Sequence, residues 1–411
     1  MTRLRPLKIS AASFSFCTFQ SFSIAAYPFL ASELHLSLGE LISAFATGSL
    51  FFLPANPFWS FLCSKYKPGT ILKTGLFVLL LSQGILLTLI LKVNEIEASY
   101  IFPLLLLSRI IYGSFCSAIV PASGIILTSG PASPHQGVKN VSGHFLGQNA
   151  GRITGPVILF IFGSSSMSAP LIILLSLGFV VWLLLFTESS GVPESPPATG
   201  TRPGNDLIQK IKSLPDGSLC IAFVALFLSF GFMYIQSGIG DTVISISTQG
   251  STDPKLFVSL LYISGTFIAI SSQLWLKAKT PKPYGPWCSL ISILMIAAIA
   301  LLICSPGLSG LWTGYLLFMI CHSLIYPTNL ASMIAHRPED SSLIFAGFGI
   351  IHGIGYGLGS FTMAMTHQSD SLYDLLVLSF VGTGTAILIT MTQKSSHMWA
   401  FSGSRYQEIQ K

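Results

Sequence analysis

The sequence GHFLGQNAGRITGP, residues 143–156, carries a glycine at every fourth position of a long, weakly charged segment. These glycines are Gly143, Gly147, Gly151 and Gly155, and Pro156 follows the last of them. Residues four apart lie on one face of an α-helix, where the missing side chains let a second helix backbone approach closely. The stretch therefore predicts a helix built for tight packing, with a bend in its outer half at Pro156.

Two arginines lie inside otherwise apolar sequence. Arg152 belongs to the stretch above, and Arg109 begins the sequence RIIYG, residues 109–113. A charge at the centre of a bilayer costs roughly 2.5–3.5 kcal/mol on insertion scales, so an arginine kept there usually faces the protein interior or an aqueous path. We therefore treat both as candidate functional residues. The alternative for Arg109 is a structural arginine satisfied by helix carbonyls, and the depth of Arg152 depends on where its helix begins.

The composition is that of an integral membrane protein. Of 411 residues, 51% are hydrophobic and 9% are charged, whereas soluble domains carry about 25% charged residues. The net charge is +6, but the basic residues stand in short loops between apolar runs, which favours membrane topology over a nucleic-acid partner. The seven cysteines are scattered singly, so we expect no disulfide framework, no metal site and no cofactor.

Spanning a hydrocarbon core of about 30 Å takes about 20 apolar residues in a helix. Runs of this kind lie near residues 9–31, 41–62, 71–91, 100–126, 138–162, 169–186, 219–240, 256–276, 286–304, 311–335, 343–365 and 372–391. The sequence therefore predicts an all-α integral membrane protein with twelve transmembrane helices. The first run is expected to be a retained helix, since it is longer than the apolar part of a signal peptide and further spans follow it.

Lysine and arginine are distributed unequally between alternate loops. The amino terminus, every second loop and the carboxyl-terminal tail hold seventeen of the twenty-one, whereas the opposite loops hold only Lys92 and Lys255. Cytoplasmic loops carry the excess of positive charge, so both termini are predicted to be cytoplasmic, in the cytoplasmic (inner) membrane. This placement requires an even number of spans.

A stretch rich in proline, glycine and serine separates the sixth run from the seventh and has the composition of a flexible linker. We therefore predict an N-terminal six-helix bundle over residues 1–187, a cytoplasmic linker over 188–218, a C-terminal six-helix bundle over 219–393 and a cytoplasmic tail over 394–411. The fifth and eleventh runs also match one another, which suggests a parallel repeat of two halves. The matching positions are Gly143, Gly151 and Gly155 with Gly347, Gly355 and Gly359. Pro121 of the fourth run also pairs with Pro327 of the tenth at nearly the same offset.

Local motifs at these positions resemble those of the major facilitator superfamily over residues 9–393, most closely its 12-helix drug/proton antiporter branch. Arg109-x-x-x-Gly113 is similar to the family's fourth-helix motif, and Gly151 to Pro156 resembles its fifth-helix Gly-x-x-x-Gly-Pro motif. The loop after the second run keeps only Leu62 and Lys65 of the family's loop motif, with Ser64 and Lys67 where the family has aspartate and glycine. The resemblance implies the major facilitator fold and a monomeric transporter.

By the same resemblance, a substrate path would be lined mainly by the first, fourth, seventh and tenth helices, with contributions from the fifth, eighth and eleventh. Each polar side chain there could contact a ligand, or bond a neighbouring helix for about 0.6 kcal/mol. The candidates are Gln20, Gln148, Asn149, Tyr234, Gln236, His322 and His352.

Proton carriers are sought among groups that titrate near neutral pH or lie at membrane depth. His322 and His352 qualify as imidazoles, although a buried neutral histidine is the commoner arrangement. Many members of the antiporter branch carry an acid in the first helix, and residues 9–31 hold none. Asp241, at the end of the seventh run, is the preferred carrier, and its alternative is a helix cap at the outer interface.

These observations predict a secondary transporter that exports a small organic, amphipathic molecule by rocking of two halves, driven by protons. One alternative is an uptake permease for a small nutrient or metabolite, including an anionic one, because Arg109 suits an anion in either direction. Another is a sensor that has kept the fold and lost transport. A membrane-embedded enzyme is not expected, since the helices hold neither a histidine with a nearby carboxylate nor a His-x-x-x-His metal motif.

Overall fold

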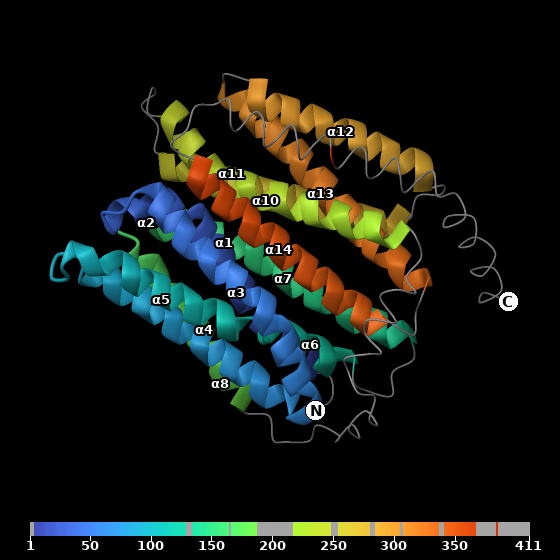
Figure 1. Ribbon diagram of the computed structural model, residues 1–411, viewed down its shortest axis with the longest axis horizontal. Helices are drawn as coiled ribbons and strands as arrows, with labels where there is room; N and C mark the ends of the chain where they lie inside the picture. Colours follow the sequence, from blue (N-terminus) through green and yellow to red (C-terminus); the bar gives the residue numbers. More distant parts are fainter. Residues whose placement is uncertain are drawn as a thin grey trace. The chain divides into compact units, whose positions relative to one another are not determined.

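The computed structural model describes residues 4–128, 134–163, 166–186, 217–247, 254–279, 284–304, 307–336 and 341–366, together with Gly384. Within these ranges every regular element is a helix (Figure 1). The N-terminal helices are α1 (Leu4–Ala25), α2 (Tyr27–Glu33), α3 (Leu38–Lys65), α4 (Pro68–Leu91), α5 (Ala98–Cys116), α6 (Ile119–Thr128), α7 (Pro134–Phe162) and α8 (Ser168–Phe186). The C-terminal helices are α10 (Gly217–Ser247), α11 (Pro254–Lys279), α12 (Tyr284–Cys304), α13 (Leu308–His336) and α14 (Ser341–Thr366).

The first eleven predicted runs each coincide with one helix or with two consecutive helices. The first run divides into α1 and α2, which meet at a bend of 69°. The fourth divides into α5 and α6. The twelfth run, residues 372–391, lies outside the described residues, so the count of twelve stays a prediction.

Seven of the described helical spans are long and apolar enough to cross a membrane, and the bent pair of α1 and α2 passes the same test when taken together. Helices α7, α12 and α14 are not among the seven, and the middle of α7 carries Gln148, Asn149 and Arg152 in addition to its glycines. Length and apolarity therefore identify most of the described helices as membrane spans, and α7 as a polar helix that needs protein neighbours.

The described residues group into two compact units. The first holds those within Met1–Thr199, Tyr234–Thr266 and Ser360–His367, and the second holds those within Gly200–Met233, Phe267–Gly359 and Gln368–Lys411. Helices α10, α11 and α14 contribute residues to both units. The predicted boundary at residues 188–218 falls almost entirely outside the described residues, so the division into two six-helix bundles stays a prediction.

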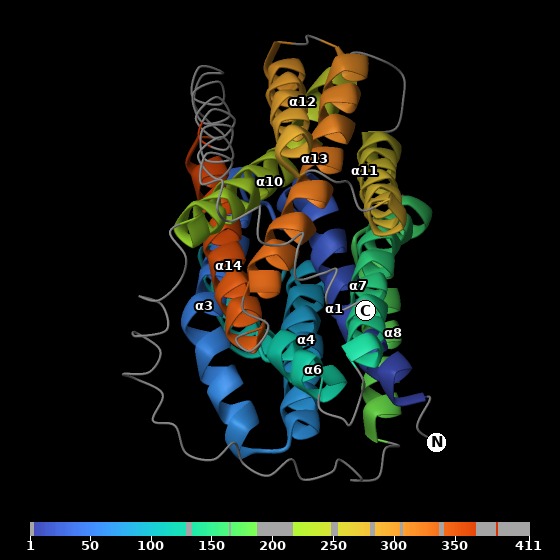
Figure 2. The ribbon, with the colours of Figure 1, turned by 90° about the vertical axis from the view of Figure 1, so that its right-hand side faces the viewer.

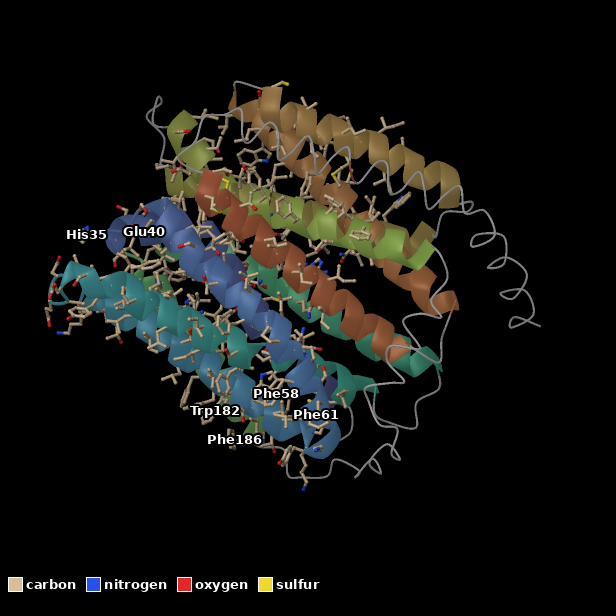
Figure 3. All side chains as sticks on the ribbon, viewed as in Figure 1. His35, Glu40, Phe58, Phe61, Trp182 and Phe186 are labelled. Carbon is tan, nitrogen blue, oxygen red and sulfur yellow. The ribbon has the colours of Figure 1, made fainter. Side chains whose placement is uncertain are left out.

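Helix α3 shows how the sequence fixes a helix at both of its ends. Ser37 caps the first turn by accepting from the Glu40 backbone N–H at 3.2 Å, while the Glu40 carboxylate accepts from the Ser37 backbone N–H at 2.8 Å. This reciprocal capping box satisfies donors that the helix itself leaves unpaired. Toward the other end Lys65 is exposed and lies 4.4 Å from the Phe61 ring centre, with Leu62 half-buried beside it. Figure 3 shows Glu40 and Phe61 toward opposite ends of this helix.

In the first unit, α1 packs along α7 (Figure 1), and the glycines of α7 make this contact possible. A Cβ atom on Gly147 would lie 2.8 Å from the Ser10 carbonyl oxygen, and one on Gly155 would lie 2.6 Å from the Thr18 carbonyl oxygen. Between them, a Cβ on Gly151 would overlap the Phe14 carbonyl oxygen. Each turn of α7 therefore meets the next turn of α1 backbone to backbone. The surroundings of Gly143 are outside the described part of the chain.

The second unit repeats this contact. A Cβ on Gly355 of α14 would lie 2.6 Å from the Leu226 carbonyl oxygen and 2.9 Å from the Phe230 backbone nitrogen of α10. The counterparts around Gly151 are a carbonyl and a backbone nitrogen four residues later on α1, from Phe14 and Thr18. The same close approach thus occurs in both halves of the sequence, at the glycines that the repeat predicted to correspond. Elsewhere in this unit α12 and α13 lie side by side (Figure 2).

Replacing Gly151 by alanine should destabilise the protein, because the added methyl group would overlap the α1 backbone. Overpacking of this kind costs roughly 1–3 kcal/mol. Gly84 of α4 is the matched control, since a Cβ there meets no atom within 4 Å. Thermal unfolding of the purified protein in detergent should show a lower midpoint for Gly151→Ala and an unchanged or higher one for Gly84→Ala. Equal midpoints for the two variants would contradict the packing argument.

Candidate functional site

Arg109 lies in α5 with only 1% of its surface exposed. Its Nη2 donates hydrogen bonds to the Ser82 carbonyl oxygen and to Ser108 Oγ, each at 3.2 Å. The guanidinium carbon lies 4.6 Å from the Phe45 ring centre and 5.5 Å from that of Tyr112. The guanidinium is therefore enclosed by side chains and helix backbone, and it does not face lipid.

No carboxylate balances this charge within the described residues, where the one ion pair found is the exposed contact of Lys92 with Glu95. The Nε of Arg109 is buried and makes no hydrogen bond there. Burying an ion costs several kcal/mol, of which the aromatic rings on its faces can return about 2 kcal/mol when the site is dry. The interior of the first unit thus holds an incompletely compensated positive charge.

A close contact between α3 and α5 holds Arg109 in place. Gly113 stands one turn after it, and a Cβ at Gly113 would overlap the Gly48 carbonyl oxygen of α3. In return, a Cβ at Gly48 would lie 2.7 Å from the Arg109 carbonyl oxygen. Because Arg109 and Gly113 are four residues apart, they share a helix face, and the glycine contact buries the arginine at the same interface.

Two serines lock α4 to α5 beside the guanidinium. Ser82 Oγ donates to the Ser108 carbonyl oxygen and Ser108 Oγ donates to the Ser82 carbonyl oxygen, both at 3.0 Å, and neither serine is exposed. Each hydroxyl donates to a carbonyl oxygen of the opposite helix, so both hydroxyl hydrogens are bonded without Arg109. The arginine uses acceptor capacity that remains on Ser82 and Ser108.

Arg152 lies at the α1–α7 contact and is half-buried. Its Nη1 is 3.5 Å from Asn149 Oδ1, the outer limit for a hydrogen bond, and a Cβ on the preceding Gly151 would lie 3.1 Å from the Cys17 Cβ of α1. Gln148 on α7 and Gln20 on α1 are both half-buried. These predicted residues therefore belong to two adjacent helices of the first unit.

An aromatic layer connects the surroundings of the two arginines. Tyr112, next to the Arg109 guanidinium, stacks on Phe16 of α1 with ring centres 6.2 Å apart and an interplanar angle of 12°. Phe52 of α3 closes the group, 5.8 Å from Tyr112 and 6.1 Å from Phe16. Helices α1, α3 and α5 thus meet through rings between Arg109 and the α1–α7 contact.

The predicted residues of α10 occupy different surroundings. The Tyr234 hydroxyl lies 3.0 Å from Thr366 Oγ1. The Gln236 backbone carbonyl accepts a hydrogen bond from the Tyr262 hydroxyl of α11. Gln236 itself is buried. Asp241 is half-buried and α10 continues past it to Ser247, so the carboxylate stands inside the helix and not at its end.

His322 and His352, predicted separately, lie in one aromatic cluster of the second unit. The His322 ring stacks on Phe232 with centres 4.4 Å apart, and the His352 ring centre lies 4.1 Å from that of Tyr356. The two imidazole centres are 6.2 Å apart, and His352 Nδ1 forms a hydrogen bond with Ser229 Oγ of α10. The cluster joins α10, α13 and α14.

Sequence reasoning missed two residues of these surroundings. Ser229 is a serine in an apolar helix, and nothing in its spacing singles it out. Glu33 ends α2, so the first helical pair does end in an acid: its Oε1 accepts the Met167 backbone N–H at 2.8 Å, while its Oε2 is buried and unbonded among the described residues. A proline in the first turn of α2, Pro28, is the signal that a second helix begins there.

The donor chemistry needed for a metal is not assembled in the described residues, which bring no three histidine, cysteine or acidic side chains into a common site. The polar groups found are instead dispersed along helix contacts.

Comparison with known proteins adds the fold. The family model described as Major Facilitator Superfamily matches residues 9–360. Among solved structures, a peptide transporter in complex with sulfate is similar at 10% identity and a TM-score of 0.72, with 97% of this chain and 95% of that chain covered. A D-xylose–proton symporter is similar at 14% identity and a TM-score of 0.70, with 94% of this chain and 95% of that chain covered. A nucleoside transporter is similar at 13% identity and a TM-score of 0.67, with 95% of this chain and 99% of that chain covered.

At these identities the likeness shows the fold alone, and it confirms the predicted all-α membrane fold class. A comparison with curated protein sequences gave no match.

Replacing Arg109 by methionine should leave the protein folded. The substitution removes a charge that the described residues do not neutralise, and it leaves the Ser82–Ser108 pair intact. Such replacements of buried charges are often neutral or stabilising. We expect an unfolding midpoint in detergent equal to or above that of the wild type, whereas Gly113→Met, which overlaps α3, should lower it. A large loss for Arg109→Met would mean that the arginine is primarily structural.

Proposed function

We propose that this chain, which belongs to the Major Facilitator Superfamily, exports a small organic, amphipathic molecule across the cytoplasmic membrane in exchange for protons. The two halves of the sequence would open alternately to the two sides, with the substrate bound near the bilayer midplane between them. The chain would act as a monomer, and its partners would be the substrate, protons and lipid.

The observation that carries this proposal is the buried, incompletely compensated Arg109. Retaining such a charge lowers stability, so its presence is best explained by work that the charge performs. A fixed cation in the interior makes the first unit sensitive to any charge that enters or leaves nearby. Proton uptake by Asp241 and arrival of the substrate are the two events that we assign to this role.

The solved structures support transport of small solutes on this fold. Those cited above are named for a peptide, a nucleoside and D-xylose, the last with protons. They support a small-molecule substrate and the compatibility of the fold with proton coupling. They give no preference among substrates for this chain.

Uptake of a small anion is the second candidate, and Arg109 favours it. A guanidinium whose Nε makes no hydrogen bond in the described residues could neutralise a carboxylate or phosphate by a charge-assisted bond. Export of an amphipathic molecule and import of an anion differ in the probe that is carried and in the direction of its flux. One flux assay with two probes therefore distinguishes them.

Gradient-driven flux in proteoliposomes should depend on Arg109 and Asp241. With ethidium as the amphipathic probe and an imposed pH gradient, we expect Arg109→Ala and Asp241→Asn each to lower the initial rate at least tenfold. Counterflow without a gradient should survive in Asp241→Asn, because exchange needs no net proton movement. If gradient-driven flux persists in both variants, the coupling roles are wrong. Inward flux of benzoate in place of ethidium would support the uptake function.

The proposed orientation places the end of α12 outside the cell. Cys304 is the last residue of that helix and is exposed, whereas Cys17, Cys63, Cys116 and Cys321 are buried. A membrane-impermeant maleimide added to intact cells should therefore label the wild type, and Cys304→Ser should lose that label. Labelling of Cys304 only after the membrane is permeabilised would reverse the assignment of both termini to the cytoplasm.

A further inference from the structure

The C-terminal helices hold very few groups that can exchange a proton near neutral pH. Helices α11 to α14 contain no aspartate or glutamate, and α10 contains only Asp241. Asp241 belongs to the first unit, so the described residues of the second unit include no acid. Among the described side chains of that unit, His322 and His352 are the ones that ordinarily change charge between about pH 5 and 8.

The hydrogen bonds of Ser229 determine which nitrogen of His352 carries the proton. Ser229 Oγ donates its single hydrogen to the Ala225 carbonyl oxygen at 2.7 Å. We assign the hydroxyl hydrogen to this carbonyl, and with that assignment Ser229 accepts from His352 and Nδ1 is the donor. In the neutral imidazole Nδ1 is then protonated, and Nε2 bears the lone pair that accepts a further proton.

Helix packing fixes this pair in place. Ser229 has no exposed surface, and a Cβ on Gly355 would lie 2.6 Å from the Ser229 Cβ. Gly355 stands three residues after His352, on the same side of α14. The backbone contact between α10 and α14 therefore sets the separation of the serine hydroxyl from the imidazole, and neither side chain is free to choose another partner without moving a helix.

Rings of α13 and α14 contact the imidazole, and a ring of α10 packs on both of them. Among the ring contacts that the structure describes, those of His352 are with two titratable groups, Tyr356 of α14 and His322 of α13, while Ser229 of α10 is uncharged. Phe232 stacks on both His322 and Tyr356, with centres 4.4 and 5.5 Å apart. Aromatic faces stabilise a neighbouring cation, so the cluster can accept an imidazolium without a carboxylate.

We propose that Ser229 is a positioning residue that holds His352 in the tautomer with Nδ1 protonated, so that His352 Nε2 takes up and releases a proton during transport. On uptake, a proton from water forms the N–H bond at Nε2 and yields an imidazolium whose Nδ1 bond to Ser229 is unchanged. Release breaks the same bond and returns the proton to water. This inference rests on the proposed proton coupling. It makes His352 a second protonation site, in addition to Asp241.

The tautomer can be observed directly in the whole protein. Nitrogen NMR of the transporter labelled with ¹⁵N-histidine, in lipid nanodiscs, would identify the His352 signals by their loss in His352→Asn. We expect the neutral wild-type ring to show a protonated Nδ1 and an unprotonated Nε2, and Ser229→Ala to populate the other tautomer. Ser237→Ala is the control, because Ser237 is a second buried serine of α10 that pairs with Ser360. An unchanged His352 spectrum in Ser229→Ala would overturn the positioning role.

Transport tests the role of the proton itself. For ethidium in proteoliposomes, Ser229→Ala should shift the pH profile of gradient-driven flux, and His352→Asn should flatten it. A normal pH profile in His352→Asn would overturn the coupling role. If wild-type flux ignores the gradient while the spectra are as expected, the proposed function fails and the effect of Ser229 on the tautomer stands.

Discussion

The approach of helix backbones to each other at glycine is the constraint on which the described architecture depends. At Gly151 of α7, Gly113 of α5 and Gly355 of α14, the contact with α1, α3 or α10 leaves no room for a Cβ atom. Such contacts tolerate neither sliding nor rotation, because any shift of one helix brings a side chain against the other backbone. They therefore fix the rotation of each helix about its own axis. This rotation also sets the direction of the polar side chains that share a helix face with the glycines.

The cost of charge in lipid then selects which polar groups can occupy those positions. Arg109 is acceptable because the glycine one turn away draws α3 over it and because two rings lie on its faces. Ser82 and Ser108 satisfy one another and still offer acceptors to the guanidinium. Packing and electrostatics are thus two aspects of one arrangement, in which the small residue makes the charged one tolerable.

Much of the fold could be predicted from the sequence, because the length of apolar runs and the position of basic loops reflect the thickness and polarity of the bilayer. Breaks within a run were harder to predict. The bend between α1 and α2 falls inside continuous apolar sequence, and Pro28 is the sequence signal that indicates it. Arg109 was predictable because a charge in an apolar run is conspicuous. Ser229 was not, because its importance comes from the helix that packs against it, and a single sequence does not show which helices touch.

Cys17 and Ser229 occupy corresponding places, each beside the glycine contact of its own half. The glycine that contacts Cys17 is Gly151, and the cationic Arg152 follows it directly in the sequence. The hydroxyl of Ser229 lies next to an imidazole, whose charge can be gained and lost. Under the proposed function, the same glycine contact would therefore stand beside a permanent charge in one half of the sequence and a reversible charge in the other, and only the second would respond to acidity.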